Sequence, residues 1–149
     1  MPVDPAFVGR VYPATEPYQV GREKLREFAA AVGVTQPACF DPAAARALGY
    51  ADVVAAPTFA AVVAQRAESA YIDDPATGID LARLVHAEES IRSRRPIVAG
   101  DLLSATLRVV SIRRRGGLAV VTTQVDLYDA VRSPVARVTS ALAVREEGE

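Results

Sequence analysis

The chain has 149 residues, of which 50% are hydrophobic and 23% charged, with 17 basic and 18 acidic side chains, one histidine and one cysteine. This length and apolar content suit one ordinary domain, so we expect a single domain over residues 1–149. The balanced charge argues against a nucleic-acid partner, because non-specific affinity for phosphates grows with the number of Lys and Arg contacts. One cysteine excludes an internal disulfide, and one cysteine with one histidine excludes a His/Cys zinc cluster within the chain.

Two further features concern the compartment. The first residues contain no basic segment followed by an apolar run, so no signal peptide is predicted. Charged residues interrupt the most hydrophobic regions, and no apolar stretch approaches the roughly 20 residues that cross a bilayer. We therefore expect a cytoplasmic protein that has no contact with a membrane.

The first half of the chain is predicted to be helical. Residues 21–32 carry apolar side chains at three- and four-residue spacing opposite a charged face, which is typical of an amphipathic helix. A second, short helix is predicted to begin at Asp41-Pro42, since aspartate is a favoured N-cap and proline is tolerated at the first helical position. Gly49 is predicted to end it.

A third helix is predicted over residues 57–72. Apolar or small side chains occupy nearly every position of its first two turns, and a helix of this kind is normally buried. Its small side chains also allow other elements to pack closely around it. The polar segment 73–78 that follows is predicted to be a loop.

From residue 80 onward the spacing of apolar side chains shortens to two, which is typical of strands. Strands are predicted over residues 84–91, 103–113, 118–128 and 135–144. Gly116-Gly117 indicates a hairpin turn, because glycine accepts a positive φ. Four antiparallel strands after one buried helix predict an α+β fold in which the sheet curls around that helix, with a sandwich of helices laid on one face as the alternative.

Few side chains of this sequence exchange protons near neutral pH. His86 is the single imidazole and so a candidate acid–base group, with a hydrogen-bonded strand histidine of no chemical role as the alternative. On a regular strand Glu88 shares the face of His86, so the two side chains can converge. Cys39 is interpreted as a small buried residue rather than a nucleophile, which is the usual fate of a free cysteine.

The start of the third helix is a candidate binding site. Helix N-termini present unpaired N–H groups and a positive dipole end, which favour a carbonyl oxygen that gains negative charge during reaction. We therefore predict that Ala56, Pro57, Thr58 and Phe59 bind substrate, with plain helix initiation as the alternative. The signatures of phosphate-binding loops and dinucleotide sites are absent, and no cofactor or metal is expected.

An ordered set of short motifs then resembles one known family, over residues 7–144. The chain resembles the MaoC-like (R)-specific hydratases and dehydratases, in the branch with a dehydratase N-terminal domain like that of type I synthases. Within that branch it is similar to the accessory subunits of the (3R)-hydroxyacyl-ACP dehydratases of fatty-acid elongation. The motifs are Tyr18-x-Val20, the segment 22–29, Phe40-Asp41-Pro42, Ala56-Pro57-Thr58-Phe59, His86-Ala87-Glu88 and the segment 95–101.

This resemblance implies a hot-dog fold, in which a curved antiparallel sheet wraps a long central helix, and an acyl tunnel between paired protomers. It also implies an acyl-CoA or acyl-ACP thioester as the ligand, and either a homodimer or a catalytic MaoC-like subunit as the partner. In a catalytic protomer, a loop between the first two helices supplies a histidine that removes the α-proton and an aspartate that assists loss of the 3-hydroxyl. Matching this loop through Pro37 and Asp41 puts Val34 at the aspartate position and Cys39 at the histidine position.

Neither of these two side chains suits the family's chemistry. Valine cannot exchange a proton, and a thiol is a poor substitute for an imidazole at neutral pH. The leading hypothesis is therefore a non-catalytic subunit that shapes the acyl tunnel for a catalytic partner. Two alternatives remain open: a stand-alone homodimeric hydratase or thioesterase that uses His86 with Glu88, and a regulatory domain that binds acyl thioesters without reacting them.

Overall fold

The computed structural model describes residues 1–146. A 3-10 turn, η3 (Pro57–Phe59), runs directly into α3, and the two together form the helix predicted over residues 57–72. The main helices and strands, in chain order, are β1 (Tyr18–Gln19), α1 (Arg22–Ala31), α2 (Pro42–Ala47), α3 (Ala60–Ile72), β2 (Leu84–Ser93), β3 (Leu102–Arg115), β4 (Leu118–Tyr128) and β5 (Pro134–Arg145).

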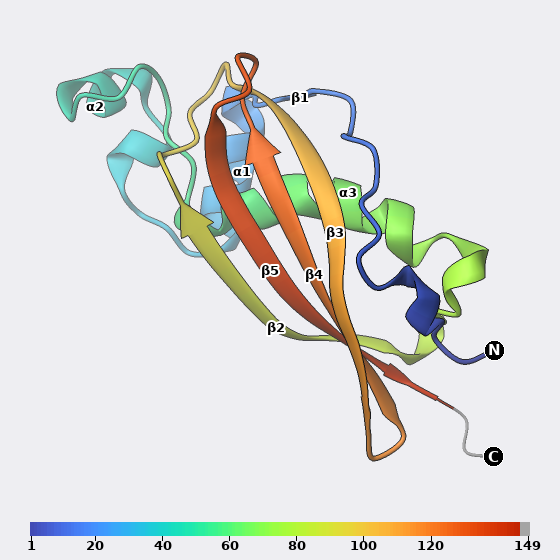
Figure 1. The fold of residues 1–149 in the computed structure, drawn as a ribbon. Coiled ribbons are helices and arrows are strands. Elements are labelled where there is room, and N and C mark those ends of the chain that lie inside the picture. Colours follow the sequence, from blue (N-terminus) through green and yellow to red (C-terminus); the bar gives the residue numbers. More distant parts are fainter. Residues whose placement is uncertain (147–149) are drawn as a thin grey trace.

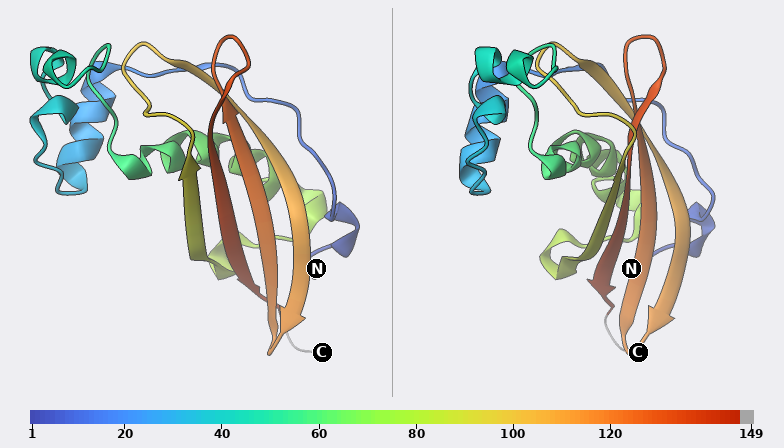
Figure 2. Two further views of the ribbon diagram at one scale, coloured as in Figure 1. Left: turned by 60° about the vertical axis from the view of Figure 1, so that its left-hand side comes forward. Right: turned by 90° about the vertical axis from the view of Figure 1, so that its left-hand side faces the viewer.

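The strands form one antiparallel sheet in the order β1-β3-β4-β5-β2. Figures 1 and 2 show that the sheet curls and that α3 lies across its concave face. The predicted α+β fold, a curved sheet around a central helix, is confirmed, as are the four long strands. The β3–β4 turn has positive φ angles at Gly116 and Gly117, as predicted. The two-residue strand β1 was not predicted, because two residues are too few to show a periodicity.

The central helix packs onto an alternating pattern of buried side chains. Every second residue of β4 is buried, which is the pattern of a strand with one face in the core. Phe59, at the start of the helix, is fully buried, and its ring centroid lies 5.4 Å from that of Phe28 and 6.3 Å from that of Tyr18. The predicted burial of this helix is therefore confirmed.

One carboxylate lies within this largely apolar core. Glu68 of α3 is 3% exposed, and its Oε1 accepts a hydrogen bond of 3.1 Å from the hydroxyl of Thr123 on β4. Ser140 of β5, opposite Thr123 in the sheet, is also buried. A polar row thus crosses the concave face of the sheet beneath α3.

Helices α1 and α2 gather at one end of the sheet, beside the start of the central helix (Figure 2). Side chains fix them there, since Nε of Arg26 on α1 donates to the carbonyl oxygen of Phe40 at 2.8 Å. Asp41 caps α2 by accepting from the backbone N–H groups of Ala43 and Ala44, which confirms the predicted helix start. The loop between these helices is thereby held next to η3.

Candidate functional site

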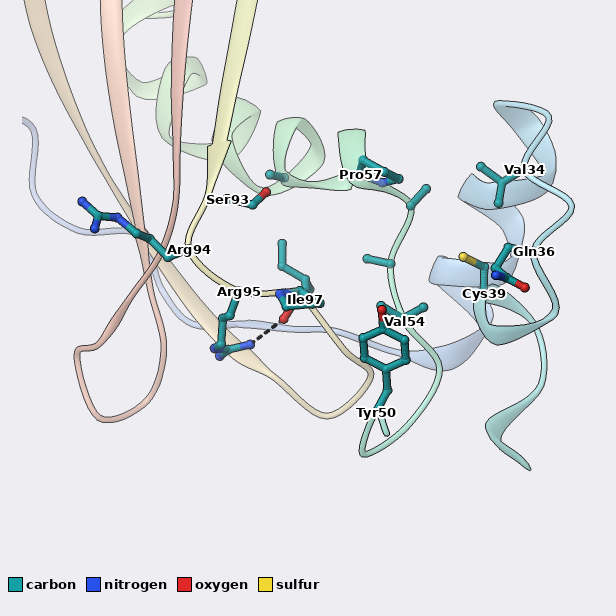
Figure 3. Close-up of a pocket in the computed structure, with 14 residues that line it drawn as sticks. Val34, Gln36, Cys39, Tyr50, Val54, Pro57, Ser93, Arg94, Arg95 and Ile97 are labelled. Carbon is teal, nitrogen blue, oxygen red and sulfur yellow. Dashed lines mark hydrogen bonds between the residues drawn. The ribbon is translucent and has the colours of Figure 1, made fainter. Parts of the chain in front are cut away.

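A cavity of about 520 Å³ lies between the helical end of the molecule and the sheet (Figure 3). Three parts of the chain surround it: the loop between α1 and α2, the segment that leads into the central helix, and the end of β2 with the loop that follows. Its walls are largely hydrocarbon, and they are formed by Val34, Gln36, Cys39, Tyr50, Val54, Ala55, Ala56, Pro57, Ala60, Ser93, Arg94, Arg95, Pro96 and Ile97.

Backbone hydrogen bonds join these three parts. The N–H of Val54 donates to the carbonyl oxygen of Ala38 at 3.0 Å, and the N–H of Ala55 donates to that of Ile97 at 2.8 Å. Val54 also forms an isolated antiparallel bridge with Val98. The segment before the central helix is therefore fixed on both sides, so the cavity wall has a defined shape.

A charged pair stabilises the loop after β2. Both terminal nitrogens of Arg95 contact the carboxylate of Asp101, at 2.8 and 3.1 Å, and Oδ2 of Asp101 accepts from the N–H of Val98 at 2.9 Å. The hydrogen bond from Arg95 to Asp101 is the main cause of the raised pKa of Arg95. This bidentate pair closes the turn that places Pro96 and Ile97 against the cavity.

Val34 and Cys39 both line the cavity, so the structure brings together the two positions that the resemblance assigned to catalysis (Figure 3). Cys39 is 4% exposed, and its burial raises the pKa of the thiol, which is therefore protonated at neutral pH. Among the lining residues, all within the described part of the chain, there is no aspartate, glutamate or histidine. The cavity walls thus offer no carboxylate or imidazole for proton transfer.

Polar residues that the sequence did not single out also face the cavity. Gln36, from the same loop as Val34 and Cys39, and Tyr50 bring an amide and a phenol to its walls. A signal for Gln36 was present, because it lies between the two residues matched to the catalytic loop. No local pattern marks Tyr50, since it reaches the cavity only through the tertiary arrangement.

The four predicted substrate-binding residues divide into two groups. Ala56 and Pro57 line the cavity, together with Ala60 one turn later. Thr58 is exposed and Phe59 is part of the core, so neither is among the lining residues. Pro57 has no N–H to donate, and the first N–H of this helix start belongs to Thr58, which has no acceptor within the helix.

His86 and Glu88 do not share a face of β2. His86 lies opposite Leu142, whereas Glu88 lies opposite Ala141, so a β-bulge separates the two. Because neighbouring residues of β5 point to opposite faces of the sheet, the side chains of His86 and Glu88 point to opposite faces as well. The predicted convergence of His86 with Glu88 is therefore wrong, since the extra residue reverses the alternation.

His86 lies beside Glu89 instead, with 3.4 Å between its Nε2 and a carboxylate oxygen of that residue. Neither side chain is among those that line the cavity, to which β2 contributes only its last residue, Ser93. At about 3.3 Å per residue, the strand between His86 and Ser93 spans about 23 Å. His86 is thus near the opposite end of β2 from the cavity.

The structure of residues 1–146 contains no group of three or more His, Cys, Asp or Glu side chains that could hold a metal ion. In the same residues, no helix has both the length and the apolar character needed to cross a membrane.

Comparisons with known proteins identify the family of the chain. Residues 6–138 match the FAS1-like dehydratase domain region. A UPF0336 protein of Clavibacter michiganensis is 49% identical over 97% of each chain. A UPF0336 protein of Streptomyces avermitilis is 44% identical over 99% of this chain and 100% of its own length.

Solved structures indicate the same family. A protein described as a MaoC-like dehydratase shares 34% identity with a TM-score of 0.84, covering 95% of this chain and 43% of that one. A chain of the HadBC (3R)-hydroxyacyl-ACP dehydratase complex from Mycobacterium tuberculosis shares 29% identity with a TM-score of 0.81, covering 92% of this chain and 96% of that one. The chain therefore belongs to the FAS1-like branch of the MaoC-like dehydratase family, whose hot-dog fold it has.

Proposed function

We propose that this protein is a non-catalytic subunit of a (3R)-hydroxyacyl thioester dehydratase or hydratase in fatty-acyl metabolism. One observation carries the proposal: Val34 and Cys39, the two residues that the family resemblance matches to a catalytic aspartate and histidine, both line the cavity. Reversible loss of water from a 3-hydroxyacyl thioester needs a base for the α-proton and an acid for the leaving hydroxyl. A second chain must supply both groups.

The character of the cavity supports an acyl thioester as its ligand. Its volume of about 520 Å³ lies in the usual range for sites that bind small molecules, and its walls are mainly apolar. Small side chains at Ala55, Ala56 and Ala60 leave room where an alkyl chain would pass the central helix. In this role the cavity holds the acyl chain and leaves the reaction to groups of the partner.

An unpaired edge of the sheet supports the proposal that a second chain binds to this protein. Strand β2 ends the sheet on one side, and no strand of residues 1–146 pairs with its outer edge. Long unpaired edges are normally covered or protected, because their free N–H and C=O groups attract other strands. A relative of known structure, HadBC, is a complex of this enzyme class. We infer that a MaoC-like catalytic chain pairs with this protein to complete the tunnel.

The proposal is tested by purifying a tagged form of this chain from its own host and identifying the chain that comes with it. The purified complex and each separated chain are then assayed for hydration of 2-enoyl thioesters. We expect turnover by the complex and none by this chain alone. Turnover by this chain alone would support the stand-alone enzyme, and a complex that binds acyl thioesters without turnover would support the regulatory domain.

A further inference from the structure

A second hollow, of about 630 Å³, lies beside the cavity at the end of β2. It is on the face of the sheet turned away from α3, since Arg92 lies opposite Arg137, a residue of the exposed face of β5. Basic side chains dominate its walls, where Arg92, Arg94 and Arg137 face a single carboxylate, Asp126. The hollow therefore has a local excess of positive charge.

That excess is not neutralised by the described residues. Arg137 is paired, because its guanidinium contacts both carboxylate oxygens of Asp126, at 2.7 and 3.2 Å. The side chains of Arg92 and Arg94 make no hydrogen bond or ion pair within residues 1–146. Arg92 also lies directly opposite Arg137, and like charges at opposed positions of neighbouring strands are destabilising. An anion bound between these side chains would relieve the repulsion.

Arg94 connects the hollow to the cavity, because its side chain lines both. Its backbone is fixed, since its N–H donates to the carbonyl oxygen of Val135 at 2.8 Å. Figure 3 shows its guanidinium group directed away from Val34 and Cys39, at the far side of the cavity. A ligand with an apolar part in the cavity would therefore bring an anionic end to Arg94 at the rim.

Acyl thioesters of phosphopantetheine have this distribution of groups: an apolar acyl chain, a neutral arm and a phosphate at the end of the arm. Arginine suits a phosphate, because its planar guanidinium can donate two parallel hydrogen bonds to two phosphate oxygens. We propose that Arg94 and Arg92 form an anion site that binds the phosphopantetheine phosphate at the mouth of the cavity. This inference rests on the proposed acyl-thioester function and names the residues that bind the phosphate of the carrier.

The test measures binding of 4′-phosphopantetheine and of pantetheine to the full-length protein, by calorimetry at low and moderate salt. We expect phosphopantetheine to bind at least about tenfold more tightly, since a charge-assisted pair of hydrogen bonds is lost with the phosphate. Arg94→Ala should raise its dissociation constant about tenfold, and Arg92→Ala with Arg94→Ala should abolish the difference between the two ligands. Added salt should weaken the binding of phosphopantetheine only.

Arg113→Ala with Arg115→Ala is the matched control. These two arginines are also exposed and lie at the β3–β4 hairpin, away from the cavity. This variant should bind phosphopantetheine like the unchanged protein. The proposal is overturned if phosphopantetheine and pantetheine bind equally, if neither binds, or if the hairpin variant weakens binding as much as Arg94→Ala does.

Two further ligands identify the source of the phosphate. Coenzyme A carries the same phosphate within a nucleotide, whereas a holo acyl carrier protein presents it on a serine. Tighter binding of coenzyme A than of phosphopantetheine, lost in Arg92→Ala with Arg94→Ala, supports the nucleotide carrier. Tighter binding of the holo than of the apo carrier protein, lost in the same variant, supports the protein carrier.

These outcomes are separable from those that test the proposed function. If binding depends on Arg94 but the purified complex has no hydratase activity, the anion site is supported and the proposed catalytic assembly is rejected. If the complex is active and Arg94→Ala leaves its KM for the thioester unchanged, the assembly is supported and the anion site is rejected. In an assembly with both features, Arg94→Ala should raise KM and leave kcat unchanged.

Discussion

Asp52 ties the start of α1 to the segment that forms the cavity wall. Its two carboxylate oxygens each accept a hydrogen bond of 2.8 Å from Arg22, and Oδ1 also accepts from the N–H of Val53 at 2.7 Å. The hydrogen bond from Arg22 first, and the backbone hydrogen bond from Val53 second, lower the pKa of Asp52 from 3.8 to about 2. The charged form of this carboxyl group is therefore favoured in the folded protein.

This lowered pKa predicts a pH dependence of stability. Because the folded pKa lies below the unfolded one, ionised Asp52 stabilises the fold fully above about pH 4, and the stabilisation is lost as the pH falls from about 4 to 2. Asp52→Asn should lower the urea midpoint at neutral pH, and the difference from the unchanged protein should shrink towards pH 2. Glu27→Gln, on the exposed face of α1, is the control and should show no such trend. A difference that stays constant with pH would contradict this role of Asp52.

Glu68 and Thr123 give a second prediction for single residues. Thr123→Val keeps the shape of the side chain but removes the hydroxyl that donates to the buried carboxylate. We expect the free energy of unfolding to fall by about 1–3 kcal/mol, as for other buried polar groups that lose their partner. Adding Glu68→Gln should recover part of the loss, because a neutral amide is less costly to bury than a charge.

The control for that experiment is Thr122→Val on the other face of β4, where the side chain is half-buried. A change there should stay within about 0.5 kcal/mol, as is usual for substitutions outside the core. Denaturant titrations at neutral pH measure all three variants. Equal effects of Thr122→Val and Thr123→Val would show that the hydroxyl of Thr123 does not stabilise Glu68.

At the scale of elements, the segment that leads into the central helix sets the width of the cavity. Ala55 and Ala60 line it, and a larger side chain at Ala55 would occupy the space proposed for the acyl chain. In the active complex, Ala55→Leu should lower kcat/KM for long-chain thioesters about tenfold or more and change that for short-chain ones little. Assays over a series of chain lengths measure this selectivity.

Ala61→Leu is a matched control for that substitution. Ala61 is also half-buried and lies on α3, but it is not among the residues that line the cavity. Its replacement should leave the chain-length profile unchanged. If Ala55→Leu reduced the rates for short and long thioesters equally, the cavity would not be the binding site of the alkyl chain.

The elements that were predicted correctly have strong local signals. The apolar first turns of the helix over residues 57–72 indicated its burial, and Gly116-Gly117 indicated the β3–β4 turn. The bulge between His86 and Glu88 was missed because one extra residue in a strand leaves no mark on its composition. The rest of the cavity was missed for another reason: Tyr50 and the segment 93–97 reach it only when distant parts of the chain meet.

In the whole molecule, the proposed pairing with a second chain explains both the cavity and the unpaired edge of the sheet. The helical end builds an apolar cavity with Val34 and Cys39 in its wall, and β2 leaves a ten-residue edge unpaired within the described chain. A second hot-dog chain on that edge would extend the sheet and bring its own acid and base to the tunnel. The single histidine of this sequence, His86, lies away from the cavity and has no role in the proposed reaction.

The most direct test of the non-catalytic role is the kcat of the purified complex after His86→Ala in this chain. A second complex carries alanine in place of the partner's catalytic histidine, in the loop between the partner's first two helices. We expect His86→Ala to leave kcat essentially unchanged, whereas the partner's substitution should reduce kcat by a factor of about 100 or more, as expected for loss of a general base. A large loss of kcat on His86→Ala, with activity retained after the partner's substitution, would contradict the non-catalytic role of this chain.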